Sequence, residues 1–195
     1  MEVKKLLKKK INYLKQIYKV NEETNSFLIE VSLDYYNEVF NGWDPSPIKR
    51  RDIDPDLLQF IERCAFDIPL KYQVELRFYL PKDKYNAKKE ELTEAGIKNN
   101  FKFIIHFIKR NLAENRKKIF IYIIMSLILL SIGYITKQQV PVDVFTTTFE
   151  EIFFIGGWVF LWEAFSIFSF SSQQTRVRLK RYTRFLDTPI HFYYI

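Results

Sequence analysis

Two long apolar stretches dominate the hydrophobic pattern in the second half of the chain. Residues 119–135 carry no charge, and in residues 149–171 only Glu163 interrupts the apolar run that follows Glu150 and Glu151. An α-helix needs about 20 apolar residues to cross hydrocarbon, and a soluble domain of this size could hardly surround two such helices with protein. We therefore predict two transmembrane helices, over 119–135 and 149–171.

The segment between these stretches is short and polar and contains Pro141, so the two helices should form an antiparallel hairpin. The threonines at 146–148 are suited to cap the second helix. Basic residues flank both stretches, whereas the connection carries only Lys137 as a positive charge. By the positive-inside rule, both flanks and both termini then lie in the cytosol. The flanking basic residues are Arg116, Lys117, Lys118, Arg176, Arg178, Lys180 and Arg181, with Arg184 further on.

The first residues of the chain show a helical pattern. Apolar residues recur at helical spacing over residues 3–20, and lysines occupy the opposite side, which predicts a basic amphipathic helix over residues 1–22. Two roles remain open for it. The helix could lie on an anionic inner leaflet, or it could pack its apolar stripe on the rest of the domain with its lysines in water.

Alternating apolar and polar residues predict two half-buried strands, one over residues 27–33 and one over 74–80. Between them, Asp54 is suited to cap a helix that begins at Pro55. The strands are parallel if they pair directly, although the long linker after the first strand also permits an antiparallel arrangement. The β-prone tail after Pro189 is expected to add a third strand.

A helix that begins near Asn86 is expected to continue through Lys118 into the first apolar stretch, because no proline interrupts it, although Gly96 leaves room for a kink. The predicted fold class is α+β, with a small cytosolic strand–helix–strand domain joined to an antiparallel two-helix transmembrane hairpin. The predicted segments are the amphipathic helix at 1–22, the cytosolic domain at 23–118, the hairpin at 119–171, and a basic helix with a C-terminal strand at 172–195.

Composition and charge narrow the class of protein. Aromatic residues make up 17% of the 195 residues and the formal net charge is +7. The basic flanks of the apolar stretches account for much of this charge, so nucleic acid is not the expected partner. The single cysteine, Cys64, falls in a helical pattern and is expected to be a small core thiol in a reducing compartment. The N-terminal residues lack the apolar core of a signal peptide, so any membrane targeting should be internal.

Glu163 is the most informative single residue of the predicted hairpin. We place it near the middle of the second helix, at a depth similar to that of Ser126. A charge at that depth costs roughly 2.5 to 3.5 kcal/mol, so it should face protein or water or be protonated. It could be a pore-lining or proton-bearing group in an oligomer, or a neutral group hydrogen-bonded to Ser126 or to a neighbouring subunit, and we favour the latter. Gly156 and Gly157 should let another helix approach closely.

A proline-rich segment after the first strand is expected to form a rigid loop anchored on the sheet. Its prolines fix φ, and its Asp and Ser side chains can accept local backbone hydrogen bonds. A metal site is not expected there, because basic residues are interleaved with the acidic ones. The predicted anchor residues are Trp43, Asp44, Pro45, Ser46 and Pro47.

The sequence contains no recognisable catalytic motif. It has no Gly-rich phosphate loop, no nucleophile elbow and no His-Glu-x-x-His pattern, and neither histidine has ligands at metal-binding spacing. We therefore expect no enzyme, no metal and no cofactor.

Several of these motifs together resemble an uncharacterised family of bacterial two-helix membrane proteins. The resemblance covers roughly residues 26–195 and depends on Phe-Asn-x-x-Asp-Pro-Ser-Pro at 40–47, the hairpin with Ile-Gly-Gly-Trp-Val-Phe-Leu-Trp at 155–162, and a basic helix before Thr-Pro-Ile. It implies a location in the bacterial inner membrane and no established activity. The chain departs from the family pattern after Trp162, where Glu163 and Ala164 replace a basic residue and a proline.

Two functions from different classes fit this pattern. The first is a membrane-anchored interaction or sensing module, whose cytosolic domain binds a protein partner or further copies of itself. The alternative is an oligomeric pore or membrane-perturbing effector that uses the second transmembrane helix. The expected partners are the lipid bilayer and either a second copy or another protein.

Overall fold

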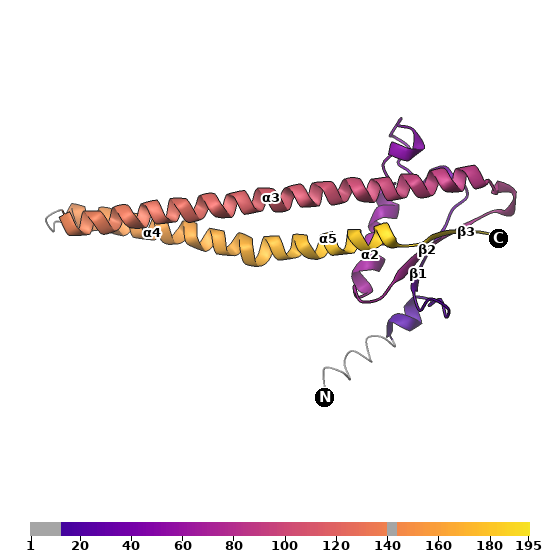
Figure 1. Cartoon of the computed structure of the whole chain (residues 1–195), viewed down its shortest axis with the longest axis horizontal. Helices are drawn as coiled ribbons and strands as arrows, with labels where there is room; N and C mark the ends of the chain where they lie inside the picture. Colours follow the sequence, from indigo (N-terminus) through magenta and orange to yellow (C-terminus); the bar gives the residue numbers. More distant parts are fainter. Residues whose placement is uncertain (1–12, 140–143) are drawn as a thin grey trace. The chain divides into compact units, whose positions relative to one another are not determined.

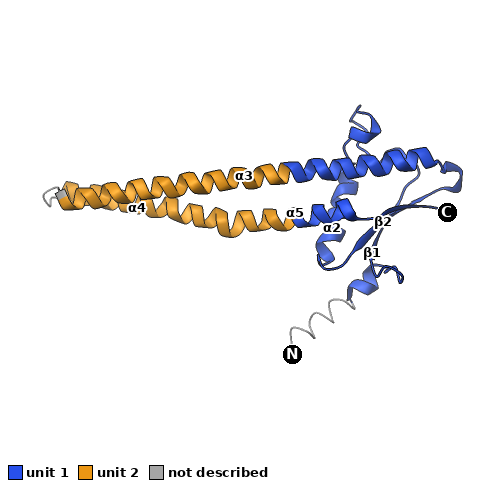
Figure 2. Cartoon of the chain, viewed as in Figure 1, with its two compact units in different colours: residues 1–106, 180–195 blue, residues 107–179 orange. Residues whose placement is uncertain are grey.

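The computed structural model describes residues 13–139 and 144–195, which form two compact units (Figure 2). One unit combines the described residues up to His106 with Lys180–Ile195, and the other is Phe107–Leu179. Most of the predicted amphipathic helix and the connection around Pro141 lie outside the described residues. Residues 13–17 are helical, and Leu14 among them is buried.

The first unit is built on a parallel sheet of three strands, in the order β1, β2, β3 (Figure 1). These strands are β1 (Phe27–Ser32), β2 (Val74–Leu80) and β3 (Ile190–Tyr194). β2 pairs in parallel with β1 on one side and with β3 on the other. Of the two arrangements that the sequence left open, the structure has the parallel one, and the third strand predicted at the C-terminus is confirmed.

The two faces of the sheet differ because side chains alternate along each strand. One face carries apolar residues from all three strands, including Ile29, Leu76 and Phe78, which are buried, and Phe192, whose ring stacks on Phe78 at 5.5 Å. The opposite face carries polar residues. They are Glu30, Ser32, Glu75, Arg77, Tyr79, His191 and Tyr193.

Helix α2 (Pro55–Asp67) begins as the sequence predicts. The Asp54 side chain accepts hydrogen bonds from the backbone N–H groups of Asp56 and Leu57, and Pro55 occupies the first turn. Cys64 is buried in this helix, as expected, and burial raises the pKa of its thiol. Short helical turns occupy the loops: η1 (Tyr36–Val39), η2 (Ile48–Arg50) and η3 (Lys82–Lys84).

Helix α3 (Ala87–Gln139) is continuous, so the predicted run from the polar helix into the first apolar stretch is confirmed. Gly96 lies within unbroken helix, and any Cβ there would meet the Ile48 carbonyl oxygen at 2.7 Å. In the first unit α3 packs with α5 (Ser172–Asp187): the Phe101 ring stacks on Phe185 at 5.0 Å. Tyr182 of α5 donates a hydrogen bond to Glu62 of α2.

The second unit contains an antiparallel hairpin of two long apolar helices, as predicted. Its second helix, α4 (Val144–Ser166), begins five residues before the predicted start at Phe149. The threonines at 146–148 are therefore inside the helix, and Thr148 Oγ1 donates to the Val144 carbonyl instead of capping the helix. α4 continues through a π-helical stretch, η4 (Ile167–Ser171), directly into α5.

Candidate functional site

The two hairpin helices approach each other closely at Gly157. A Cβ at this position would lie 2.7 Å from Leu130 Cγ and 3.3 Å from the Ser126 carbonyl oxygen. A larger residue at this position would overlap α3, so the contact depends on glycine. At Gly156, by contrast, a Cβ would meet only Leu129 Cδ1, at an ordinary 3.4 Å. Of the two predicted packing glycines, one is required by the contact and the other is tolerant.

Glu163 and Ser126 do not meet within the chain. Ser126 is 1% exposed and faces Gly157, and its hydroxyl has no hydrogen-bond partner among the described residues. Glu163 is exposed and lies six residues beyond Gly157, which is about 9 Å along a helix that rises 1.5 Å per residue. The predicted hydrogen bond between the two side chains is therefore absent, because they lie at different levels of the hairpin.

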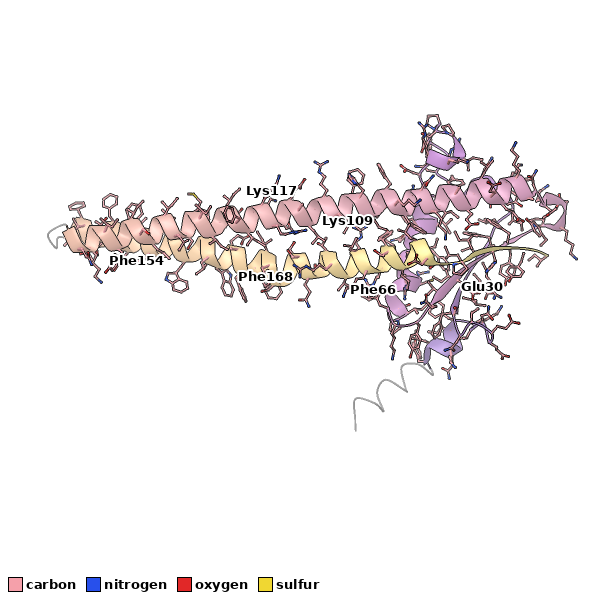
Figure 3. The ribbon with its side chains drawn as sticks, in the orientation of Figure 1. Glu30, Phe66, Lys109, Lys117, Phe154 and Phe168 are labelled. Atoms are coloured by element: carbon pink, nitrogen blue, oxygen red, sulfur yellow. The ribbon has the colours of Figure 1, made fainter. Side chains whose placement is uncertain are left out.

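The outer surface of the hairpin is apolar on both helices (Figure 3). Only 11% of the most apolar 18-residue stretch in each helix is buried by protein. A core helix of a soluble protein is mostly buried, and these two helices are not; both are long and apolar enough to cross a membrane. The large exposed residues include Phe120, Ile121, Leu127, Ile128, Tyr134, Ile135, Phe149, Ile152, Ile155, Trp158, Val159 and Trp162.

Most of the predicted basic flank is exposed. Asn115 Nδ2 donates to Ser171 Oγ at 3.2 Å, which places the two flanks of the hairpin at the same end. The Arg181 guanidinium lies 4.3 Å from the centroid of the Phe66 ring and so also contacts α2. The exposed basic residues are Arg116, Lys117, Lys118, Arg176, Arg178 and Lys180.

Arg184 differs from these residues because its guanidinium closes the C-terminal end of α2. It donates to the backbone carbonyls of Ala65, Ile68, Pro69 and Tyr72 at 3.1 to 3.3 Å. Burial lowers the pKa of Arg184 to about 10. The residue that the sequence placed in the basic flank is therefore a packing residue that ties α5 to α2.

The predicted anchor loop has local hydrogen bonds, and Trp43 does not pack on the sheet. The Trp43 side chain is 92% exposed, whereas Phe40 is buried and forms a bridge to Ile53. Asp44 accepts hydrogen bonds from the N–H groups of Ser46 and Asp52, and these bonds hold the pKa of Asp44 below its usual value. Pro45 and Pro47 are exposed in the same loop.

A hollow of about 530 Å³ lies beyond the carboxyl ends of β1 and β2, the position at which open α/β sheets usually bind ligands. Tyr36 and Phe40 line it with largely buried rings, and Lys84 lies over the ring of Tyr35 at 5.1 Å. Its acidic residues are already engaged. Asp54 caps α2, and Glu38 accepts from the Asp34 N–H at 2.9 Å.

The polar face of the sheet holds a buried carboxylate. Glu75 accepts hydrogen bonds from Asn21, Thr24 and Arg77. Burial by itself raises the pKa of Glu75, but these hydrogen bonds and the charge of Arg77 outweigh burial and lower it below the usual value. The network ties the segment before β1 to β2 and leaves no acceptor free for chemistry on a substrate.

A second hollow, of about 500 Å³, runs beside β3. Residues from the first turns of α3 and from β3 line it. They are Ala87, Glu90, Glu91 and Glu94 of α3 and Ile190, His191, Phe192 and Tyr193 of β3. Tyr194 donates to Glu90 and is hydrogen-bonded to Tyr36, which fixes the end of β3 against α3. Three carboxylates and the imidazole of His191 line this hollow, with no lysine or arginine among them.

Within 13–139 and 144–195, no three His, Cys, Asp or Glu side chains come together in a way that could hold a metal ion. Comparison with protein-family models, with curated proteins and with solved structures finds no match. The fold and the site must therefore be interpreted from this chain alone, and the family resemblance stays a prediction.

Sequence reasoning missed the two hollows and the Glu75 network. Each joins residues that are far apart in the chain, such as Thr24 with Glu75 or Glu90 with Tyr194. The alternation of polar residues along the strands gave a partial signal, since it defines a polar face. It could not show that the face holds a buried carboxylate.

Proposed function

We propose that this chain is a two-pass membrane protein in which α3 and α4 cross a bacterial inner membrane and the α+β unit acts in the cytosol as an interaction or sensing module. The observation that carries the proposal is the apolar outer surface of the hairpin, in which only 11% of each apolar stretch is buried. Apolar side chains of this kind are more stable in contact with lipid than with water.

The energetics support lipid over water. Burying one large apolar side chain is worth roughly 1.5 to 3 kcal/mol. Twelve or more such residues on the hairpin are about half to two-thirds exposed, so their exposure to water would cost on the order of 10 to 20 kcal/mol. This cost is as large as the roughly 5 to 15 kcal/mol by which a whole domain is stable.

The distribution of basic residues supports the orientation. Both flanks are basic and lie at one end of the hairpin, whereas Lys137 is the one basic residue described near the other end. The test is labelling with a membrane-impermeant maleimide on intact spheroplasts, in a Cys64→Ala background. Lys137→Cys should react at once, and Lys118→Cys only after permeabilisation. The opposite pattern would reverse the orientation.

The α+β unit supports an interaction role because it has its own core, two open hollows and no group of metal ligands among the residues that the structure describes. Nucleic acid is not the partner we propose. The charge that might attract it is largely placed at the flanks of the hairpin, where anionic lipid is the nearer counterion.

Formaldehyde cross-linking of the full-length protein in membranes tests the interaction role. We expect a discrete cross-linked species that contains either a second copy or another protein. Val74→Asp places a charge at a fully buried position of β2 and should abolish this species, while Ser32→Asp, on an exposed position of the same sheet, should not. Recovery of the monomer alone from the wild-type membranes would show that the interaction role is wrong.

A second candidate function is favoured by Glu163. Its exposed side chain shares a seven-residue stripe of α4 with Gly156, and a carboxylate in the apolar belt is stabilised by a neighbouring subunit or by water. An oligomeric pore built on this stripe should let ions leak from liposomes, and Glu163→Gln should change the leak while Glu151→Gln should not. Absence of any leak would leave only the interaction module.

A further inference from the structure

We infer that the free edge of β3 is a docking site for an extended basic segment of a partner protein, which would add to the sheet as a fourth strand. The inference rests on the proposed interaction role and names the class of partner.

The register between β2 and β3 fixes which backbone groups of β3 are free. The Leu76 N–H donates to the Pro189 carbonyl, and the Ile195 N–H donates to the Leu80 carbonyl. In a parallel ladder the groups that face the neighbour belong to alternate residues, here 189, 191, 193 and 195. The N–H and C=O groups of Ile190, Phe192 and Tyr194 therefore point away from the sheet, and no described residue pairs with them.

The opposite edge of the sheet is covered where it begins. At β1, the Leu28 N–H donates to the Lys19 carbonyl at 2.9 Å, and Val20 forms an antiparallel bridge with Phe27. Proteins usually cover or blunt the edges of their sheets, because a row of unpaired backbone groups is a template for another strand. β1 is thus blunted at its start, whereas the outward-facing groups of β3 are unpaired along the whole strand among the described residues, so β3 is the edge better suited to accept a partner.

The hollow beside β3 supplies the charge selectivity. Glu91 is exposed, and Glu94 lies 3.9 Å from Lys98. The ammonium group of Lys98 is occupied by the carbonyls of Leu186 and Thr188, at 2.9 and 3.1 Å. Lys98 keeps its charge in these bonds, but the hollow holds three glutamates and Lys98 pairs with one of them, at 3.9 Å. An added strand therefore gains most when it carries lysine or arginine.

The position of the glutamates fixes the spacing of these basic residues. Tyr194 belongs to the face of the sheet that packs on the helices, and it reaches Glu90 of α3. Every second side chain of an added strand would point to that same face, toward α3. The partner is thus expected to carry lysine or arginine at alternate positions, over the five residues that match β3. Backbone hydrogen bonds would supply affinity, and the alternate side chains specificity.

The test uses full-length protein in phosphatidylcholine nanodiscs, which lack anionic lipid that would compete for a basic probe. The probe is the peptide Ac-Lys-Thr-Lys-Val-Lys-Thr-NH₂, and its controls are the same peptide with Glu in place of Lys and an N-methylated form. Residue-resolved hydrogen exchange should show at least about tenfold more protection of the Phe192 and Tyr194 amides, with little change at His191 and Tyr193, whose amides already face β2.

Variants of α3 test the charge selectivity. Glu91→Gln combined with Glu94→Gln should weaken peptide binding about tenfold, while Glu114→Gln, exposed further along the same helix, should leave it unchanged. Equal binding of the Glu-substituted or N-methylated peptide, no binding of the Lys peptide, or protection that spares Phe192 and Tyr194 would overturn the inference. If the peptide fails but the cross-linked species in membranes persists, the partner docks elsewhere and the interaction role stands.

Discussion

Arg184 and Arg176 lie about two turns apart in α5 and look alike in the sequence, yet their surroundings differ. Arg184 donates to four backbone carbonyls near the end of α2, whereas Arg176 is exposed. Hydrogen bonds that involve a charged group are worth roughly 1.5 to 3 kcal/mol. Arg184→Gln should therefore lower the free energy of unfolding by about 2 kcal/mol. Arg176→Gln should leave it unchanged in thermal unfolding followed by near-ultraviolet circular dichroism, and equal effects would contradict this role.

Glu75 makes the stability of the α+β unit depend on pH. Because hydrogen bonds from Thr24, Asn21 and Arg77 lower its folded-state pKa below the usual 4.5, its contribution is complete above that pH and is lost as the pH falls through the lower folded value. Glu75→Gln should cost about 1 to 3 kcal/mol at pH 7 and flatten the loss of stability below pH 4.5.

Urea unfolding at a series of pH values measures this dependence. Glu23→Gln, on an exposed residue of the same segment, is the matched control. If the free energy of unfolding of the Glu75→Gln variant fell as steeply with acid as that of the wild type, the buried carboxylate would not set the pH dependence.

Single residues could be predicted from the sequence where their partners are near in the chain. The Asp54 cap and the buried Cys64 are of this kind, because a cap and a helical face are local features. Arg184 and Glu75 could not be assigned, since the partners of Arg184 lie more than 100 residues away and two of the three partners of Glu75 lie about 50 residues away. A basic residue in a basic run gives no sign of whether it faces water or a helix end.

At the scale of elements, the hairpin contact depends on one of two adjacent glycines. Gly157→Ala would bring a Cβ to 2.7 Å from Leu130 Cγ and should separate the helices, while Gly156→Ala meets only ordinary contact. Both changes gain the same helix propensity, so their difference isolates the overlap. We expect Gly157→Ala to destabilise the hairpin by about 1 to 3 kcal/mol relative to Gly156→Ala.

Distances between spin labels on α3 and α4 in nanodiscs, together with thermal unfolding, would measure this effect. Labels at Ile128 and Val159, both exposed, leave the contact itself intact. Unchanged distances and stability in Gly157→Ala would show that the helices are not held at this point.

Elements were predicted best where the hydrophobic pattern was long. The first two strands follow from periodicity, the third follows from the β-propensity of the tail, and the proline-free sequence explains why α3 does not break. The start of α4 was placed five residues too late because the threonine run looked like a cap, whereas β-branched residues are also accepted inside an apolar helix. The register that brings Gly157 opposite Ser126 depends on side-chain packing and could not be obtained from either helix alone.

At the scale of the whole molecule, the chain joins a sheet-based unit that has its own core to a hairpin that has almost none. The sequence indicated this contrast through the change from alternating to continuous apolar residues near residue 119. β3, which follows the hairpin in the sequence, pairs with β2. The sheet of the α+β unit can therefore be completed only after the hairpin residues have been synthesised. Deleting residues 189–195 should therefore unfold the α+β unit and leave the hairpin in the membrane.

The partition of the full-length protein after cell lysis without detergent tests the central claim most directly. The account predicts that the chain stays in the membrane pellet after washing at pH 11 and is released only by detergent, because the apolar surface of the hairpin has no other solvent. Recovery of the intact chain in the supernatant, folded and monodisperse, would contradict it.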